Sequence, residues 1–184
     1  MSRQRDPRIK RRLREGAIDY VLESGFTDFS LRPAAAALGT SARMLAYHFG
    51  SREGLLRDIL AGLREREAAR IEAWWSNARS PRTMAGFVRW YWKRLAGRAA
   101  EPAVRLIFEL YALALRHPEE LPGVLTEPVA YWQALVRRAG LRSDVATSTL
   151  LLAATRGLLL DLTATGDRAR VDKAVARLCA LLEK

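Results

Sequence analysis

The chain has 184 residues, enough for one ordinary domain or for two small domains that share a core. Hydrophobic residues make up 49% and charged residues 28% of it, as in a soluble globular protein. The formal net charge of +11 favours a polyanionic partner, nucleic acid first and a membrane surface second, although a compositional preference for arginine is an alternative source of the charge. The sequence shows neither an apolar run of the ~18 residues that a membrane span needs nor a signal peptide. Cys179 is the only cysteine, so no intrachain disulfide can form and we expect a cytoplasmic protein.

The first predicted element is a helix that follows a basic arm. Residues 1–14 hold seven basic side chains and one acid, Asp6, and we expect this arm to contact DNA phosphates, a solvated tail being the alternative. Asp6 and Pro7 match the N-cap and the first position of a helix that ends near Gly25.

No alternating β-branched run is present, and Ala, Leu, Arg and Glu dominate, so we predict an all-α fold of about nine helices.

The most informative pattern lies over about residues 30–49, where two short helices are joined by a tight turn. Ser30 is a suitable N-cap for the first of them, and Gly39, which readily adopts a positive φ, would end it. Thr40 or Ser41 would then cap the second helix. Two helices separated by about three residues around a glycine form a helix-turn-helix, whose second helix enters the major groove of DNA.

A long helix is predicted after this pair, over residues 52–77, with Ser51 as its N-cap. Its first half carries apolar residues for the N-terminal core, while Ile71, Trp74 and Trp75 lie beyond that core, so we expect a rigid lever between two cores. The remaining helices are predicted over residues 81–97, 102–116, 125–139, 143–165 and 168–182.

Residues in and around the two short helices resemble the signature of the TetR family of bacterial transcription regulators. They are Leu38, Gly39, Leu45, Tyr47, His48, Phe49, Ser51, Arg52, Glu53, Leu55 and Leu56, with Gly25 and Phe26 ahead of them. The resemblance implies a three-helix helix-turn-helix DNA-binding domain over residues 7–67 and a helical ligand-binding and dimerisation domain over residues 68–184. Three positions depart from the family pattern, which often has an aromatic at Ala46, a lysine at Arg52 and a non-glycine residue at Gly54.

The resemblance also implies which side chains meet DNA. The matching positions are Ser30, Arg32, Thr40, Ser41, Ala42, Arg43, Met44, Tyr47, His48 and Arg52. Arg32 and Arg43 can each bond O6 and N7 of a guanine together, and Arg43 is the strongest candidate for reading a base. Tyr47 and His48 resemble the family's backbone-contacting pair. The alternatives are a structural hydrogen bond for His48 and an ion pair with a nearby acid for Arg52.

Aromatic residues concentrate in the middle of the chain, where ten of the fifteen lie between residues 74 and 132. Since aromatic and apolar side chains line ligand cavities, we expect a pocket for a small hydrophobic effector, with a plain packed core as the alternative. Its candidate lining residues are Trp74, Phe87, Trp90, Tyr91, Phe108, Tyr111 and Trp132. Residues 73–100 hold six basic side chains and no acid, a run compatible with a solvated face or with an anionic ligand.

The last two predicted helices are too apolar to lie on the surface of a lone subunit. Small residues at Ala153, Ala154 and Gly157 let another helix approach closely, and the resemblance implies a homodimer in which these helices form a four-helix bundle. The alternative is that the helix over 143–165 is only the core helix of a monomer. The expected interface residues are Leu151, Ala154, Gly157, Leu158, Val171, Val175, Leu178 and Leu182. Cys179 is expected to be a buried apolar residue, with a disulfide between subunits as the alternative.

These patterns predict a homodimeric transcription regulator, in such families most often a repressor, that binds double-stranded DNA at a palindromic operator and responds to an effector. We expect no cofactor, metal or catalytic residue, because two histidines and one cysteine come without carboxylates at metal-ligand or acid–base spacing. The alternatives are a DNA-binding dimer that uses its C-terminal domain for protein contacts, and an all-α enzyme or transport module.

Overall fold

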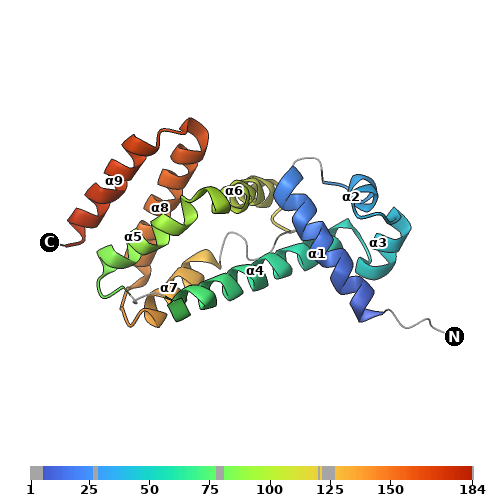
Figure 1. Cartoon of the computed structure of the whole chain (residues 1–184), viewed down its shortest axis with the longest axis horizontal. Coiled ribbons are helices and arrows are strands. Elements are labelled where there is room, and N and C mark those ends of the chain that lie inside the picture. Colours follow the sequence, from blue (N-terminus) through green and yellow to red (C-terminus); the bar gives the residue numbers. More distant parts are fainter. Residues whose placement is uncertain (1–5, 27–28, 78–80, 120, 122–126, 184) are drawn as a thin grey trace. The chain divides into compact units, whose positions relative to one another are not determined.

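The computed structural model describes residues 6–26, 29–77, 81–119, 121 and 127–183. These described residues form nine α-helices and one short 3-10 helix, and no strand (Figure 1). The prediction of an all-α fold is therefore confirmed. The chain divides into two compact units, residues 1–78 and 79–184, so the first unit extends beyond the boundary predicted at residue 67.

The first unit is built from four helices. They are α1 (Pro7–Ser24), α2 (Leu31–Ala37), α3 (Ala42–Phe49) and α4 (Arg52–Asn77). α1 packs against α4 and the two short helices, and α3 also packs against α4. Apolar side chains from each of them are buried in the core of this unit: Leu13, Ala17, Ile18, Val21, Ala34, Ala35, Leu45, Phe49, Leu55, Leu56 and Ile59.

Local hydrogen bonds set the boundaries of these helices largely as predicted. The Asp6 carboxylate accepts a hydrogen bond from the Arg8 amide at 2.8 Å, and the Ser41 hydroxyl accepts one from the Met44 amide at 3.2 Å. Gly39 ends the α2 segment with φ at 62°, a conformation that other residues rarely adopt. Ser30 stands at the N-cap of α2 with extended backbone, but its side chain makes no capping hydrogen bond.

The second unit is built around one long apolar helix. Its elements are α5 (Met84–Leu95), the 3-10 helix η1 (Arg98–Ala100), α6 (Glu101–Arg116), α7 (Pro128–Arg138), α8 (Val145–Thr165) and α9 (Arg168–Leu181). α8 contacts α5, α6, α7 and α9. α5 is shorter than predicted because the Thr83 hydroxyl caps it, accepting from the Gly86 amide at 3.0 Å. The predicted start of α7 at residue 125 lies outside the described residues.

By length and composition, α8 is apolar enough to cross a membrane, although it carries Arg156 and Asp161. The sequence was expected to contain no apolar run of that length, and Arg156 does interrupt the run within α8. The core helix of a soluble protein passes the same test. α8 buries Leu151, Leu152 and Leu159 inside its own unit, which gives its composition an ordinary structural reason.

Candidate nucleic-acid interface

α3 presents one face to the core of the first unit and the opposite face to solvent. Leu45 and Phe49, four residues apart, are buried and fix the helix on the unit. Arg43 is exposed, and Met44 and Tyr47 expose 38% and 40% of their surface. The packing of α3 therefore turns a mixed basic and apolar surface outward.

The turn that precedes α3 adds polar groups to the same short segment. Ser41 is exposed, Thr40 and Ala42 are half-buried, and at the start of α2 Ser30 is exposed. A helix leaves several amide groups unpaired at its N-terminus, and the Ser41 hydroxyl accepts a hydrogen bond from only one of them, that of Met44. Such an N-terminus favours anions, phosphate groups among them.

Arg32 and Arg43 are the basic side chains of this segment that the fold leaves free. Both are exposed, and neither forms a hydrogen bond or ion pair with any other residue that the structure describes. An arginine in this state can direct its fork of donors to a guanine edge or a phosphate without breaking an existing contact.

Arg52 and His48 occupy positions that differ from their predicted roles. The Arg52 Nε donates to the Phe29 carbonyl at 3.1 Å, which ties the start of α4 to the segment before α2, so this side chain supports the fold whether or not it also meets phosphate. His48 is buried, with its ring at 5.1 Å from that of Tyr47, and neither ring nitrogen bonds to a described residue. Both readings of His48, a direct DNA contact and a structural hydrogen bond, are therefore corrected: it is a packed core ring.

The basic arm is also only partly available. Arg8, Arg11 and Arg12 are exposed on α1, whereas Lys10 Nζ pairs with Asp58 Oδ2 at 2.9 Å and lies over the Phe49 ring. Arg3 and Arg5, which the prediction also included, lie outside the described residues.

Four of the seven aromatic candidates for an effector pocket come together in the second unit. The Phe87 ring lies 5.2 Å from that of Trp132 and 5.7 Å from that of Trp90, and Tyr91 lies 4.8 Å from Trp132, as measured between ring centroids. Phe87 and Trp132 are fully buried. The Trp132 Nε1–H is buried as well, and no described residue accepts its hydrogen bond.

Of the other three candidates, two are on α6 and one, Trp74, is on α4. Phe108 and Tyr111 are half-buried on α6, where the Arg156 guanidinium lies 4.8 Å from the Tyr111 ring, and the Trp74 side chain lies outside the described residues. Burial raises the pKa of Tyr111, and the nearby Arg156 opposes that rise. A cavity of about 450 Å³ is present instead between α5 and α9, and none of the seven lines it. Within the described residues, no group of three or more His, Cys, Asp or Glu side chains is placed to hold a metal ion.

Comparison with known proteins relates this arrangement to solved structures. No protein-family model matches the sequence, and no curated protein matches it. The multidrug binding protein EbrR in complex with imidazole is 28% identical, with 97% of this chain and 93% of that chain covered and a TM-score of 0.71. EbrR in complex with proflavin is 27% identical, with 92% and 98% covered and a TM-score of 0.64. A protein described as a TetR-family transcriptional regulator from Rhodococcus sp. is 20% identical, with 95% and 97% covered and a TM-score of 0.67.

The chain has the TetR-family fold. The resemblance inferred from the motif is thus confirmed over nearly the whole chain, including the second unit, where only the helix layout had indicated it. In this TetR-family fold the helix-turn-helix of the first unit consists of α2, the turn at Gly39 and α3.

The expected dimer-interface residues of the TetR-family fold divide between core and surface. Leu151, Val171 and Val175 are buried inside their own subunit, so their prediction as interface residues is corrected. Of the other five, Gly157 is exposed. The remaining four are half-buried: Ala154, Leu158, Leu178 and Leu182. Cys179 is buried, as its role as a small apolar residue predicted, and its burial raises the pKa of the thiol.

The expected interface left out Leu150 and Leu160, two large side chains that α8 exposes. Leu150 is 66% and Leu160 is 50% exposed, and Ala153 and Gly157 lie between them on the same exposed face. The spacing of three or four residues was available as a signal, but leucines on every side of α8 concealed it.

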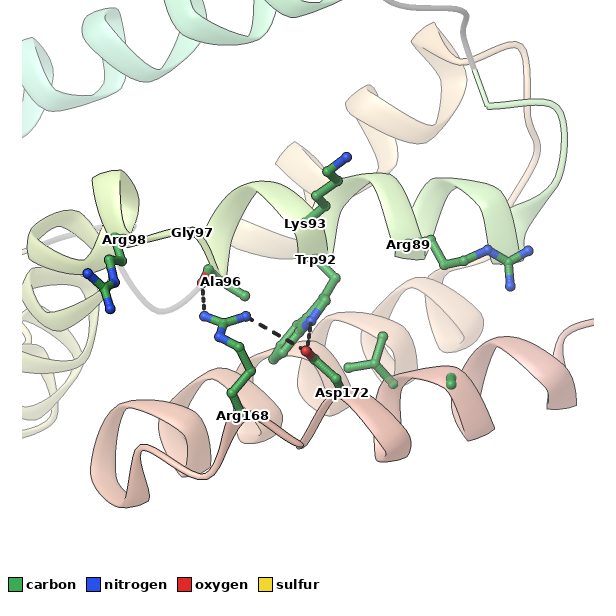
Figure 2. Close-up of a pocket in the computed structure, with 10 residues that line it drawn as sticks. Arg89, Trp92, Lys93, Ala96, Gly97, Arg98, Arg168 and Asp172 are labelled. Atoms are coloured by element: carbon green, nitrogen blue, oxygen red, sulfur yellow. Dashed lines mark hydrogen bonds and ion pairs between the residues drawn. The ribbon is translucent and has the colours of Figure 1, made fainter. Parts of the chain in front are cut away.

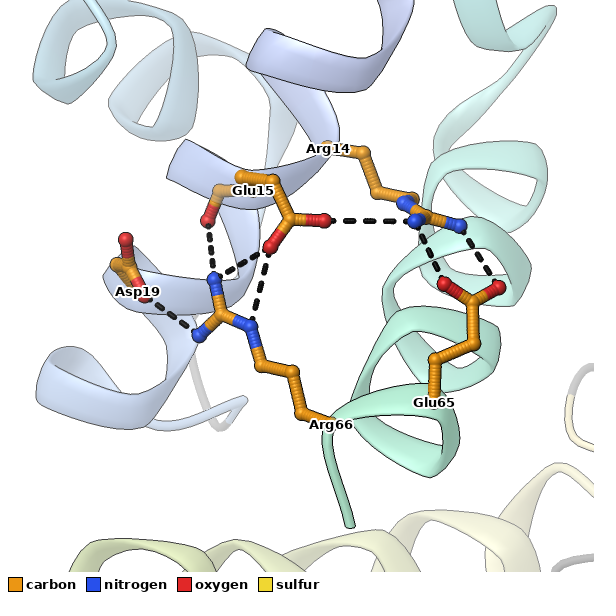
Figure 3. Close-up of polar contacts among 5 residues, drawn as sticks. All are labelled: Arg14, Glu15, Asp19, Glu65 and Arg66. Atoms are coloured by element: carbon orange, nitrogen blue, oxygen red, sulfur yellow. Dashed lines mark hydrogen bonds and ion pairs between the residues drawn. The ribbon is translucent and has the colours of Figure 1, made fainter. Parts of the chain in front are cut away.

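A cluster of charged side chains between α1 and α4 was also missed (Figure 3). Arg66 Nη2 lies 2.7 Å from Glu15 Oε2, and Arg66 Nη1 lies 2.6 Å from Asp19 Oδ1. Arg14 Nη2 lies 2.7 Å from Glu65 Oε2. Burial acts to lower the pKa of Arg66, but hydrogen bonds to Asp19 and Glu15 outweigh it and raise that pKa above its ordinary value. These contacts fix α1 on the helix that follows the helix-turn-helix.

Proposed function

We propose that the protein is a TetR-family transcriptional regulator that binds a palindromic DNA operator as a homodimer and responds to a small hydrophobic effector. The observation that carries this proposal is the outward face of α3, where Arg43, Met44 and Tyr47 are exposed while Leu45 and Phe49 hold the helix in place. A helix-turn-helix whose second helix is firmly seated and whose outer face is basic has the geometry needed to enter a major groove.

The residues of this segment have different parts in DNA binding. Arg43 reads a guanine edge, and Ala42 beside it packs on a thymine methyl. Ser41 and the N-terminus of α3 hold a phosphate, and Tyr47 contacts the backbone. Arg32 supplies a second cation from the start of α2. His48 is left out of this set because it is buried.

The proposed dimer forms through the exposed face of α8. Leu150, Ala153, Gly157 and Leu160 follow one another at helical spacing and leave an apolar strip with a close-approach point at Gly157. A two-fold symmetric contact between two such strips places two recognition helices on the two halves of a palindrome.

The proposed effector binds in the aromatic cluster, beside Trp132. The buried and unpaired Nε1–H of this side chain is a cost of about 1–3 kcal/mol that an acceptor atom on a bound molecule would remove. EbrR, whose structures contain imidazole and proflavin, shows that a protein of this fold accommodates small molecules. An effector shifts DNA binding only if it binds the DNA-competent and incompetent states with different affinity.

Selection of bound duplexes from a random pool tests the DNA-binding proposal. We expect a palindrome, and we expect Arg43→Ala to weaken binding to it by about 1–3 kcal/mol while relaxing the preference at one base pair. The matched control is Arg70→Ala, since Arg70 lies on α4 and pairs with Glu67 at 3.1 Å. Equal binding of the Arg43→Ala variant and the wild type to selected and scrambled duplexes would contradict the assignment.

Analytical ultracentrifugation of a Gly157→Phe variant tests the dimer. A Cβ added at Gly157 meets no atom within 4 Å in the subunit, so the larger side chain leaves the subunit fold intact but obstructs a partner helix. We expect a dimeric wild type and a folded, monomeric variant. The control is Leu115→Phe, because Leu115 is 73% exposed on α6 and does not belong to the proposed α8 strip. A wild type that stays monomeric at micromolar concentration would refute the proposal.

A further inference from the structure

The cavity between α5 and α9 lies entirely within the second unit (Figure 2), and none of the clustered aromatic residues around Trp132 lines it. Its volume of about 450 Å³ falls within the range of small-molecule sites. Trp92, Ala96 and Val175 form an apolar wall and are nearly buried. The cavity is therefore large enough, and apolar enough on one side, for the body of a small organic molecule.

The remaining lining is strongly cationic. Four basic side chains line the cavity, namely Arg89, Lys93, Arg98 and Arg168, against one carboxylate, that of Asp172. Asp172 is already engaged, because the Trp92 Nε1–H donates to its Oδ1 at 2.9 Å and Arg168 Nη1 lies 3.9 Å away. With Asp172 beside Arg168 and Glu183, outside the lining, paired with Arg89, two of the four positive charges remain uncompensated.

The basic side chains differ in how firmly the fold holds them. The Arg168 guanidinium donates to the Ala96 carbonyl at the end of α5, and Arg89 pairs with Glu183 (Figure 2 draws the Arg168 contacts). Lys93 and Arg98 are exposed, and in the part of the chain that the structure describes neither forms an ion pair or hydrogen bond. A held guanidinium costs little further ordering when it binds, and a free one can close onto a ligand.

We propose that this cavity binds a small organic carboxylate, with its hydrocarbon or aromatic body against Trp92 and Val175 and its anionic group between Arg98 and Arg168. An arginine donates two parallel hydrogen bonds to a carboxylate, and an apolar wall beside the charge favours an anion with an apolar body over an inorganic one. The site shares no residue with the proposed DNA-binding face, so a ligand-binding measurement tests it separately from DNA binding.

Isothermal titration calorimetry with naphthalene-2-carboxylate tests the proposal, and the neutral naphthalene-2-carboxamide serves as its matched control ligand. We expect saturable binding of one carboxylate per subunit, at least about tenfold tighter than that of the amide, because hydrogen bonds to a charged group carry that difference. Equal binding of the two compounds would overturn the proposal, since it would show that the cations take no part.

Two variants and a control locate the binding. Arg98→Glu reverses a charge of the cavity and is expected to weaken carboxylate binding at least tenfold, whereas Arg82→Glu makes the same charge change outside the cavity and is expected to alter it less than twofold. Ala176→Trp fills the cavity from its exposed edge and is expected to abolish binding of both compounds. Circular dichroism checks the fold of each variant, and Arg98→Gln replaces any Arg98→Glu protein that fails to fold. Equal effects of the Arg98 and Arg82 variants, or unchanged binding by Ala176→Trp, would refute the site.

Discussion

The two units of this chain are held together in different ways. In the first, basic residues of α1 and α4 form ion pairs between positions about fifty residues apart, as Arg66 does with Glu15 and Arg14 with Glu65. In the second, the described ion pairs mostly join near neighbours, such as Arg105 with Glu101, and the apolar α8 contacts four other helices. A smaller unit gains more from specific links between its helices, whereas a larger one relies more on its core.

Close packing at a glycine of the first unit should give the largest difference between the units. A Cβ at Gly54 would stand 2.0 Å from the Phe49 carbonyl oxygen, a backbone atom that cannot move without shifting the end of α3. We expect Gly54→Ala to lower the free energy of unfolding by about 3 kcal/mol, the upper end of ordinary overpacking. Urea denaturation measures it.

The matched control lies in the second unit. A Cβ at Gly97 would meet its nearest neighbours, two carbonyl oxygens, at 3.6 Å, which is ordinary contact. Gly97→Ala should therefore change the free energy of unfolding by less than about 1 kcal/mol. Similar losses for the two substitutions would show that the close approach of α3 and α4 is not a special constraint.

The ion pairs offer the next largest difference. Removing the Arg66 side chain in Arg66→Met leaves Glu15 and Asp19 without their shared partner, and about two-thirds of that side chain is shielded from water. We expect a loss of about 2 kcal/mol, which shrinks at high salt, whereas Arg105→Met should cost at most about 0.5 kcal/mol. Denaturation at 0.05 M and 1 M salt compares them. Equal losses would contradict the view that long-range ion pairs distinguish the first unit.

Local chemistry explains which parts of the fold were predictable. Ser41 and Gly39 act through their own backbone neighbourhood, so sequence alone placed the end of α2 and the start of α3. Leu45 and Phe49 were identifiable as core because α3 has apolar side chains on one face only.

Distance in the sequence and uniform composition explain what was not predictable. The bond from Arg52 to the Phe29 carbonyl and the cluster around Arg66 depend on how helices meet, which no local rule encodes. On α8, leucines occur on all sides, so the sequence does not indicate which face of the helix is buried. Leu151 was predicted at the interface and is buried, while its neighbour Leu150 is exposed. The cavity between α5 and α9 likewise combines residues that lie about eighty positions apart.

Helix caps should behave alike in the two units. The hydroxyls of Ser41 and Thr83 both accept from a backbone amide at the start of their helices, at 3.2 Å and 3.0 Å. Ser41→Ala and Thr83→Ala should each cost about 1 kcal/mol in chemical denaturation, and Ser30→Ala, whose side chain makes no such bond, only a few tenths. A loss at Ser30 equal to that at Ser41 would show that the hydroxyl bond is not what stabilises the α3 start.

The smallest expected effect is on the acid dependence of stability, and it has the same sign in both units. A backbone hydrogen bond from Thr147 lowers the pKa of Asp144 at the start of α8, and a hydrogen bond with the Ser51 hydroxyl lowers that of Glu53 at the start of α4. A carboxyl whose pKa is lower in the folded than in the unfolded state stabilises the fold above its unfolded pKa, about 4, and loses that effect as the pH falls through the folded value. Asp144→Asn and Glu53→Gln remove the titration, so their melting temperatures should fall less steeply than that of the wild type between pH 5 and pH 2. Parallel melting curves for a variant and the wild type over this range would show that the carboxylate concerned makes no net contribution, and that its helix start relies on neutral caps alone.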